Sequence, residues 1–310
     1  MDALFPSWLL IAGGLIGLFA GGEALVRGAV GVAGRLRLPS LLIGLTVVGF
    51  GTSTPELLVS LDAALRGSPD IAIGNILGSN IGNILLIVGL AALVWPIRLG
   101  QMRMARDVGV MLLAALILVP LFLGGQLGRA AGAALVALLV AYLVWSYLRP
   151  GDGAGDEAQG RARSLWLSGL WVVLGLAALM LGARALVSGA VAVARDFGVS
   201  EAFIGLTIVA IGTSLPELAT SMIAALRRQS AIAIGNIVGS NIFNVLGILG
   251  VTAMVAPIPV ASRFLVLDLP VMIAATLLLA CLLLLNRGAG RSWGLILLVA
   301  YGAYVFVAQG

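Results

Sequence analysis

The chain has 310 residues, of which 61% are hydrophobic and only 10% are charged. A soluble domain carries about 25% charged residues, so this composition excludes an ordinary soluble protein and indicates an integral membrane protein. The net charge of +5 comes from 18 Arg residues, without Lys or His. In a membrane protein such a charge reports orientation rather than nucleic-acid binding.

Ten apolar segments follow one another, each near the ~20 residues that a spanning helix needs. A short polar, Gly-rich stretch separates the first five from the last five. The sequence therefore predicts an all-α membrane protein with ten transmembrane helices, a first unit of residues 1–149, a linker of 150–164 and a second unit of 165–310. The segments are 7–34, 40–66, 70–95, 107–124, 128–149, 165–195, 201–227, 231–256, 265–286 and 291–309.

The two units contain the same motif at a constant offset of 161 in the numbering. Gly44–Leu57 returns as Gly205–Leu218, and the match extends over repeats of about 40–95 and 201–256. Because each unit has an odd number of spans, the second enters the membrane upside down relative to the first. Inverted-topology repeats of this kind are typical of secondary transporters, whose sites lie where the repeats meet near the membrane midplane.

Each copy of the motif interrupts its own helix. Pro55 and Pro216 lack a backbone N–H, so the carbonyl four residues earlier loses its helical partner. Each proline is followed by an acid, Glu56 or Glu217, and an ionised carboxylate in the bilayer costs about 2.5–3.5 kcal/mol on insertion scales. Irregular backbone at that depth is tolerated only where it is buried in protein or lines a wet cavity. Helices 2 and 7 are therefore predicted to be discontinuous, with a cation site between them.

The arginines predict the orientation. Twelve fall on the side of the linker and four on the opposite side, while Arg27 and Arg184 lie within spans. The positive-inside rule places the linker in the cytoplasm and both termini outside. We expect the membrane to be the inner membrane of a prokaryote.

A polar stripe follows each broken helix. Asn75, Ser79 and Asn83 recur every four residues on one helix face, and Asn236, Ser240 and Asn244 repeat them. Interhelical hydrogen bonding would explain such a stripe, but its recurrence after both carboxylates favours ligands. We assign Ser79, Asn83, Ser240 and Asn244 to the site, and Asn75, Asn80, Asn236 and Asn241 to packing.

The candidate residues supply oxygen of several kinds, which hard cations such as Ca²⁺ and Na⁺ prefer. The absence of an accompanying Cys, His or Met set argues against zinc, copper or iron. Two carboxylates held close in a low dielectric repel each other, so the site favours protons or bound cations. The oxygens are the carboxylates of Glu56 and Glu217, the hydroxyls of Ser53, Ser79, Ser214 and Ser240, the amides of Asn83 and Asn244, and unwound carbonyls around Thr52 and Thr213.

Other charged residues within the spans have structural explanations as well as functional ones. Glu23 and Arg27 are four residues apart and share a helix face, and Arg184 occupies the position of Glu23 in the second unit. The pair is either an ion pair near a helix end or a gate latch between the two long helices. Asp107 and Asp268 lie near the starts of their spans, where an acid suits the helix dipole.

With these residues in view, the chain resembles the calcium:cation antiporter superfamily, in particular its bacterial and archaeal sodium/calcium exchanger branch. The motif Gly-Thr-Ser-x-Pro-Glu occurs at 51–56 and 212–217, and Gly-Ser-Asn-Ile-x-Asn at 78–83 and 239–244. A single copy would be weak, but two copies with matching spacing are specific.

The resemblance implies four cation positions between the broken helices and the helices that follow them. The central ligands would be Glu56 and Glu217 with the carbonyls of Thr52 and Thr213. Some relatives have Asp where this chain has Asn83 or Asn244, and in the potassium-dependent branch this Asp is associated with potassium use. The presence of Asn at both positions therefore argues against potassium as a substrate, and it leaves only two acids in the site. The outer sodium positions would be lined by Ser53, Ser79, Ser214 and Ser240 and by the carbonyls of Gly49 and Ala210.

We therefore expect a secondary antiporter that exchanges Ca²⁺ for Na⁺, with the first and sixth helices sliding across the core as the resemblance implies. The transported ions would be its substrates, and membrane lipid its surroundings. We expect no tightly bound cofactor, enzymatic activity, nucleic acid or obligatory protein partner. The main alternative is Ca²⁺/H⁺ exchange through the same two Glu residues. An enzyme acting on lipid phosphates would need an asymmetric nucleophile–base pair and a cationic phosphate clamp, whereas the polar cluster here is symmetric and acidic. A cation channel is also disfavoured, because a channel does not need broken helices that seal a site at the membrane midplane.

Overall fold

The computed structural model describes residues 4–36, 38–96, 104–149, 164–198, 210–285 and 289–308. Within these ranges, eight helices are long and apolar enough to cross a membrane, or nine when a bent pair between residues 40 and 65 counts as one span. The predicted segment 201–227 begins outside the described residues, and its described part is helical from Ala210.

The first half consists of helices with one short strand, and π-helical turns (η) interrupt two of its spans. The second and third predicted spans are each built from several helical pieces. The elements are α1 (Leu4–Leu36), α2 (Ser40–Ile43), η1 (Gly44–Val48), α3 (Gly49–Thr52), α4 (Thr54–Leu65), α5 (Pro69–Gly82), η2 (Asn83–Ile87), α6 (Val88–Val94), α7 (Ala105–Leu123), β1 (Gln126–Leu127) and α8 (Arg129–Leu148).

The second half has the same plan, and several boundaries agree with the first half at the offset of 161. Thus α3 and α4 correspond to α11 and α12 residue for residue. The elements are α9 (Leu165–Asp196), α11 (Ala210–Thr213), α12 (Leu215–Leu226), α13 (Ser230–Ile242), η4 (Phe243–Leu249), α14 (Gly250–Val255), β2 (Ile258–Pro259), η5 (Phe264–Asp268), α15 (Leu269–Leu284) and α16 (Arg291–Ala308).

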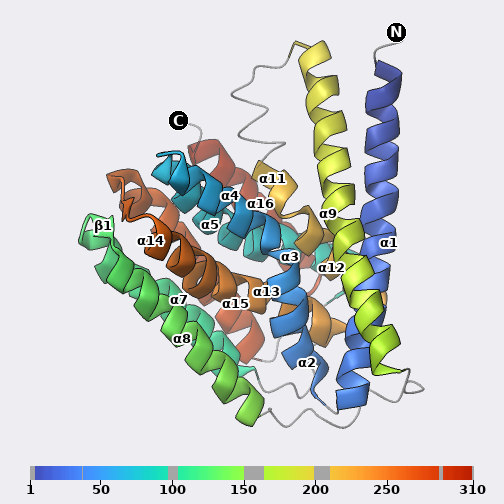
Figure 1. Cartoon of the computed structure of the whole chain (residues 1–310), viewed down its shortest axis with the longest axis horizontal. Coiled ribbons are helices and arrows are strands. Elements are labelled where there is room, and N and C mark those ends of the chain that lie inside the picture. The colour runs from blue at the N-terminus through green and yellow to red at the C-terminus, as the bar shows by residue number, and fades with distance from the viewer. Residues whose placement is uncertain are drawn as a thin grey trace.

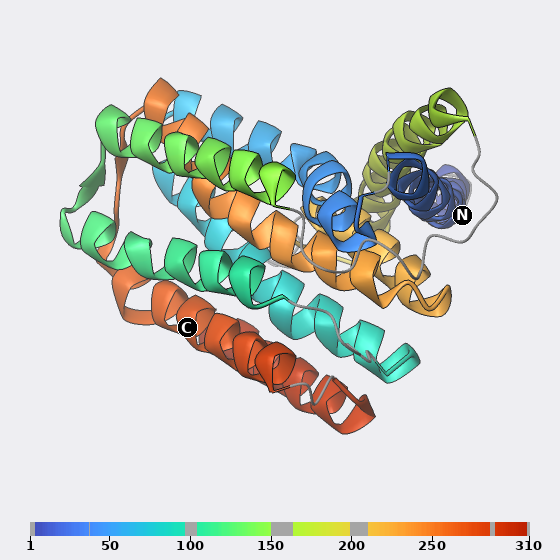
Figure 2. The same cartoon turned by 90° about the horizontal axis from the view of Figure 1, so that it is seen from below.

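The long helices α1 and α9 form a pair at one side of the molecule and pack against the main bundle through helices such as α12 (Figures 1 and 2). Their backbones touch through glycines: a Cβ on Gly175 would lie 2.5 Å from the Leu25 nitrogen, and one on Gly14 would lie 2.7 Å from the Gly182 carbonyl oxygen. Small residues allow such close approach of helices in membranes.

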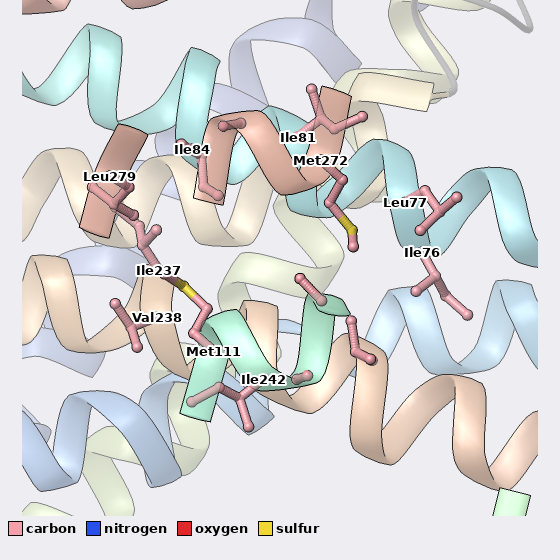
Figure 3. Packing of buried hydrophobic residues seen from close by; sticks show 14 of the residues in the cluster. Ile76, Leu77, Ile81, Ile84, Met111, Ile237, Val238, Ile242, Met272 and Leu279 are labelled. Atoms are coloured by element: carbon pink, nitrogen blue, oxygen red, sulfur yellow. The ribbon is translucent and has the colours of Figure 1, made fainter. Parts of the chain in front are cut away.

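The core of the main bundle surrounds two central spans, α5–η2–α6 and α13–η4–α14. Their most apolar windows are 78% and 94% buried within the protein, against 11% for α16. Figure 3 shows aliphatic side chains of these spans, such as Ile81 and Ile242, packed together with Met111 of α7 and Met272 of α15. The outer helices, by contrast, expose large apolar side chains where lipid would lie.

A two-residue ladder joins the loop after α7 to the loop after α14. Strand β1 pairs antiparallel with β2, with Gln126 opposite Pro259 and Leu127 opposite Ile258. The sequence does not signal this ladder, because two residues are too few to show the alternation on which strand prediction depends.

Asp107 and Asp268 tie neighbouring helices together. The Tyr142 hydroxyl of α8 donates to Asp107 at 3.0 Å, and the Tyr304 hydroxyl of α16 donates to Asp268 at 2.8 Å. Asp107 lies in the first turn of α7 as predicted, but Asp268 lies at the end of η5, a turn into its helix. Both acids therefore share a hydrogen bond from a tyrosine, and each also pairs with an arginine, Arg106 or Arg263.

The close packing of α13 against η1 generates a prediction about stability. A Cβ on Gly239 would overlap the carbonyl oxygen of Leu45 and lie 2.7 Å from its Cα. We expect Gly239→Ala to destabilise the protein by about 1–3 kcal/mol, the usual cost of overpacking. Thermal unfolding in detergent measures this as a lower melting temperature. Gly109→Ala is the control because nothing lies within 4 Å of its new Cβ, and equal melting of both variants would contradict the prediction.

Candidate cation-binding site

Both broken helices end at a serine. Ser53 has φ −81° and ψ 8° between α3 and α4, and Ser214 has φ −87° and ψ 6° between α11 and α12. A ψ near zero departs from the helical value, and a proline in the first turn of each following helix lacks an N–H. The pieces of the first break meet at an angle of 43°. Pro55 and Pro216 thus each begin a new helix, as the sequence predicts.

The two carboxylates lie in the first turns of α4 and α12, and each contacts the break of the other half. The Ser53 hydroxyl donates to Glu217 Oε1 at 2.9 Å, and the Ser214 hydroxyl donates to Glu56 Oε1 at 3.3 Å. Both Glu side chains are buried, with 1% exposure. The fold therefore brings together two acids that lie far apart in the sequence.

At each break, one asparagine binds the backbone of the helix that follows the break. Asn75 Nδ2 donates to the Glu56 carbonyl at 3.2 Å, and Asn236 Nδ2 donates to the Glu217 carbonyl at 3.3 Å. Their Oδ1 atoms accept from the threonines that precede the opposite breaks, Thr213 at 3.5 Å and Thr52 at 3.1 Å. Each asparagine thus connects one half's carboxylate helix to the other half's helix break.

The serines of the polar stripe also face the breaks. Ser79 Oγ lies 3.4 Å from Ser214 Oγ, and Ser240 Oγ donates to the Gly49 carbonyl at 3.2 Å. Gly49 has to be small here, because a Cβ would lie 3.0 Å from the Ser240 nitrogen. Its equivalent, Ala210, is the first residue of α11.

The amides of Asn83 and Asn244 are buried within the bundle, with 1% and 0% exposure. Asn83 Nδ2 donates to Asn241 Oδ1 at 3.1 Å, and Asn244 Nδ2 donates to Asn80 Oδ1 at 2.9 Å. Each of these bonds crosses from one half of the chain to the other. The amide nitrogens are therefore occupied, and the oxygens remain for another partner.

Four buried oxygens of the candidate residues lack a hydrogen-bond partner within the described part of the chain: Glu56 Oε2, Glu217 Oε2, Asn83 Oδ1 and Asn244 Oδ1. Buried polar atoms normally have partners. Carboxylate and amide oxygens with nearby hydroxyls suit Ca²⁺ or Na⁺. Among the described residues, no group of three or more His, Cys, Asp or Glu could hold a metal, so the charge of this arrangement comes from two acids.

A cavity of about 330 Å³ leads toward this cluster from one side. It lies between α4, α9 and α11 and reaches Thr213, a candidate ligand through its carbonyl, and Pro55, which directly precedes Glu56. Arg184 of α9 lines it together with apolar residues such as Leu58 and Val187. The cavity therefore connects the neighbourhood of the carboxylates to the surface of the protein.

The corresponding position in the other half is closed. There α1 packs on α12, and a Cβ on Gly22 would lie 3.1 Å from Ile223 Cγ1. Glu23 forms ion pairs with Arg27 of the same helix and with Arg227 at the end of α12. The predicted pair of Glu23 and Arg27 is confirmed, whereas the charged partner of Glu23 on another helix is Arg227 of α12, rather than a residue of the second long helix.

Four residues for which the sequence predicts packing roles contact the candidate ligands: Asn75, Asn80, Asn236 and Asn241. Each hydrogen bonds to a ligand side chain, or to the backbone of one. Their recurrence at the offset of 161 is a usable signal, because the candidate ligands recur at the same offset.

Comparisons with known proteins agree over nearly the whole chain. The family model for "Sodium/calcium exchanger protein" matches residues 6–148 and 167–309. CaxA of Alkalimonas amylolytica, a putative antiporter, is 42% identical over 95% of this chain and 96% of its own length. The sodium/calcium exchanger MaX1 of Methanosarcina acetivorans is 31% identical over 97% of this chain and 98% of its own. A structure of the sodium-calcium exchanger NCX_Mj soaked with Na⁺ superimposes with a TM-score of 0.85 at 31% identity, covering 97% and 98% of the two chains.

The unpartnered carboxylate oxygens predict how the site responds to Ca²⁺. Glu56→Gln and Glu217→Gln should each abolish the rise in melting temperature that Ca²⁺ gives the unaltered protein, because a bound ligand at 100 times its Kd stabilises by about 2.7 kcal/mol. Without Ca²⁺ both variants should melt no lower than the unaltered protein, since each removes a buried charge that lacks a counter-ion.

The control for these variants is Asp62→Asn, which removes an exposed carboxylate paired with Arg66 and should leave the Ca²⁺ response intact. A Ca²⁺-dependent rise that persists in either Glu variant would contradict the assignment of that residue.

Proposed function

The chain belongs to the sodium/calcium exchanger family, in the bacterial and archaeal branch of the calcium:cation antiporters, and we propose that it exchanges Ca²⁺ for Na⁺. It is an integral membrane antiporter for cations that include Ca²⁺; Na⁺ as the driving ion is the proposal. The proposed ligands are Glu56, Glu217, Ser53, Ser214, Ser79, Ser240, Asn83 and Asn244, with the carbonyls of Thr52, Thr213, Gly49 and Ala210.

The observation that carries this proposal is a set of four buried oxygens, contributed by both halves of the chain, that have no hydrogen-bond partner among the described residues. Moving a charged group from water into the protein interior costs several kcal/mol unless an opposite charge lies beside it. Two carboxylates in such surroundings need cations or protons beside them. One Ca²⁺ neutralises both, and Na⁺ ions distributed over the same oxygens do so too. Occupancy by one kind of ion then excludes the other, which is the basis of exchange.

We further propose that the two halves are inverted five-helix repeats, making ten spans in all, with residues 150–164 as a cytoplasmic linker and both termini outside a prokaryotic inner membrane. The matching boundaries of α3–α4 and α11–α12 at the offset of 161 support the repeats. The reciprocal bonds Ser53–Glu217 and Ser214–Glu56 also fit a two-fold relation. The distribution of arginines supports the orientation.

Alternating access is supported by the difference between the two sides of the cluster. The cavity between α4 and α9 reaches the residues beside the carboxylates, while the contact of α1 with α12 covers the equivalent path. A movement of the α1–α9 pair that opened the second contact and closed the first would expose the same ligands to the opposite side. The glycine-lined contact within the pair would let both helices move as one unit.

The driving ion is tested in vesicles containing the purified protein. With pH clamped on both sides, we expect an outward-directed Na⁺ gradient to drive ⁴⁵Ca²⁺ uptake, because Na⁺ leaving the vesicle frees the oxygens for Ca²⁺. Vesicles with Glu56→Gln or Glu217→Gln serve as controls and should show only background uptake.

The same vesicles test Ca²⁺/H⁺ exchange, the second candidate, since the unpartnered Glu oxygens could instead carry protons. If Ca²⁺ uptake does not depend on the Na⁺ gradient but is driven by an imposed pH gradient, Ca²⁺/H⁺ exchange replaces Ca²⁺/Na⁺ exchange as the function.

The closed contact between α1 and α12 generates a prediction about access. Leu58 lines the cavity, and Ala219 is its equivalent at the offset of 161, against α1. In a Cys281→Ala background, a cysteine at 58 should react with a water-soluble maleimide faster than one at 219. Glu23→Gln removes the bond to Arg227 and should speed the reaction at 219 by about two- to fivefold, as expected for an ion pair worth up to about 1 kcal/mol.

The matched control is Asp62→Asn, which removes an ion pair with Arg66 that lies at the end of α4 and does not involve α1. It should leave the reaction at position 219 unchanged. Equal rates at positions 58 and 219 in the unaltered background would contradict a protein that is open to one side only.

A further inference from the structure

We propose that Asn80 and Asn241 are positioning residues, and that each acts with a buried methionine to turn the amide oxygens of Asn83 and Asn244 toward the ions. This inference rests on the proposed function and explains how two neutral residues serve a cation site. A side-chain amide can flip about its last bond and exchange its oxygen and nitrogen with little change of shape, so its neighbours decide which atom faces the site.

The inner amides, those of Asn83 and Asn244, each donate to an outer amide, that of Asn241 or Asn80. Asn244 Nδ2 donates to Asn80 Oδ1 at 2.9 Å, and Asn83 Nδ2 donates to Asn241 Oδ1 at 3.1 Å. All four side chains are at most 3% exposed, so water does not compete for these bonds. With its nitrogen held from behind, each inner amide presents only its oxygen, and both oxygens lack another partner among the described residues.

The outer amides, those of Asn80 and Asn241, each face a buried methionine. Asn80 Nδ2 faces the thioether of Met272 at 3.6 Å, and Asn241 Nδ2 faces that of Met111 at 3.8 Å. A thioether is a weak acceptor and cannot donate, so it favours the amide nitrogen over the amide oxygen. Both methionines lie among buried aliphatic side chains (Figure 3), with 2% and 1% exposure for Met111 and Met272.

The arrangement is duplicated, because Met111 and Met272 are themselves related by the offset of 161. Two relays therefore run toward the site, from Met272 through Asn80 to Asn244 and from Met111 through Asn241 to Asn83. They differ in one respect: Asn80 Nδ2 also donates to the backbone carbonyl of Asn241 at 3.3 Å. Asn80 thus has a second acceptor that orients it, whereas Asn241 depends on Met111.

An inner amide that turned would point N–H groups, in place of its oxygen, at the cation that we propose to bind there. This change weakens cation binding without removing a ligand residue. The relays therefore favour cations by keeping the amide N–H groups of Asn83 and Asn244 turned away from the site.

The test compares Met111→Leu with Met272→Leu, two swaps that conserve volume and remove only the thioether. We expect Met111→Leu to raise the half-saturating Ca²⁺ concentration about two- to threefold, and Met272→Leu to leave it nearly unchanged because Asn80 keeps its backbone acceptor. Asn241→Leu, which removes a buried hydrogen bond, should raise it about five- to tenfold. The maximal exchange rate should change little, since a uniform loss of binding leaves the transport step intact.

Half-saturation is measured twice, by exchange in vesicles and by Ca²⁺ binding to the detergent-solubilised protein without any gradient. The binding measurement separates this inference from the proposed function. If the variants change Ca²⁺ binding as expected but a Na⁺ gradient does not drive Ca²⁺ uptake, only the proposal of Na⁺ as the driving ion is wrong. If Asn241→Leu does not fold, the comparison of half-saturating Ca²⁺ concentrations in Met111→Leu and Met272→Leu is sufficient to test the relay. Equal half-saturation in Met111→Leu and Met272→Leu would overturn the relay, as would an unchanged value in a folded Asn241→Leu.

Discussion

The structure depends on two buried carboxylates that neither half of the chain can accommodate alone. Glu56 accepts a hydrogen bond from the second half and Glu217 accepts one from the first, so each site half is completed by the other. Burial raises the energetic cost of the two charges, because little water is left to solvate them. The helix breaks supply part of the missing solvation by turning the hydroxyls of Ser53 and Ser214 toward the acids. The second oxygen of each carboxylate has no hydrogen-bond partner among the described residues, and we propose that cations occupy this position.

The two halves match closely around the carboxylates and differ where they meet the long helices. Glu23 and Arg227 attract each other between α1 and α12. The residues equivalent to them, Arg184 and Arg66, are both cations, and Arg66 pairs locally with Asp62. The same contact therefore cannot form between α9 and α4, where the cavity lies. Opposite charges on one side and like charges on the other make the two closures unequal in energy, although the backbone that surrounds them is nearly repeated.

The features that depend on local chemistry could be predicted from the sequence. Proline, serine and glutamate at 53–56 and 214–217 predict both helix breaks, and the offset of 161 pairs them. Contacts set by tertiary packing, such as that of Arg227 with Glu23 in a distant helix, have no local signal. Packing roles are predicted for the asparagines at 80 and 241 because a sequence does not reveal which way an amide points. Met111 and Met272 repeat at the same offset, but in an apolar helix a methionine is usually a packing residue.

The methionines also explain how a polar site can be surrounded directly by an apolar core. A chain of hydrogen bonds that runs into a core ordinarily ends at a group that itself requires a partner, and a buried group without one is costly. A thioether accepts weakly and needs nothing in return. Each relay can therefore end at Met111 or Met272, whose neighbours in the core include isoleucine and leucine side chains (Figure 3). The relays consist of uncharged side chains, so the proposed ligands Asn83 and Asn244 add oxygens without changing the charge that Glu56 and Glu217 give the site.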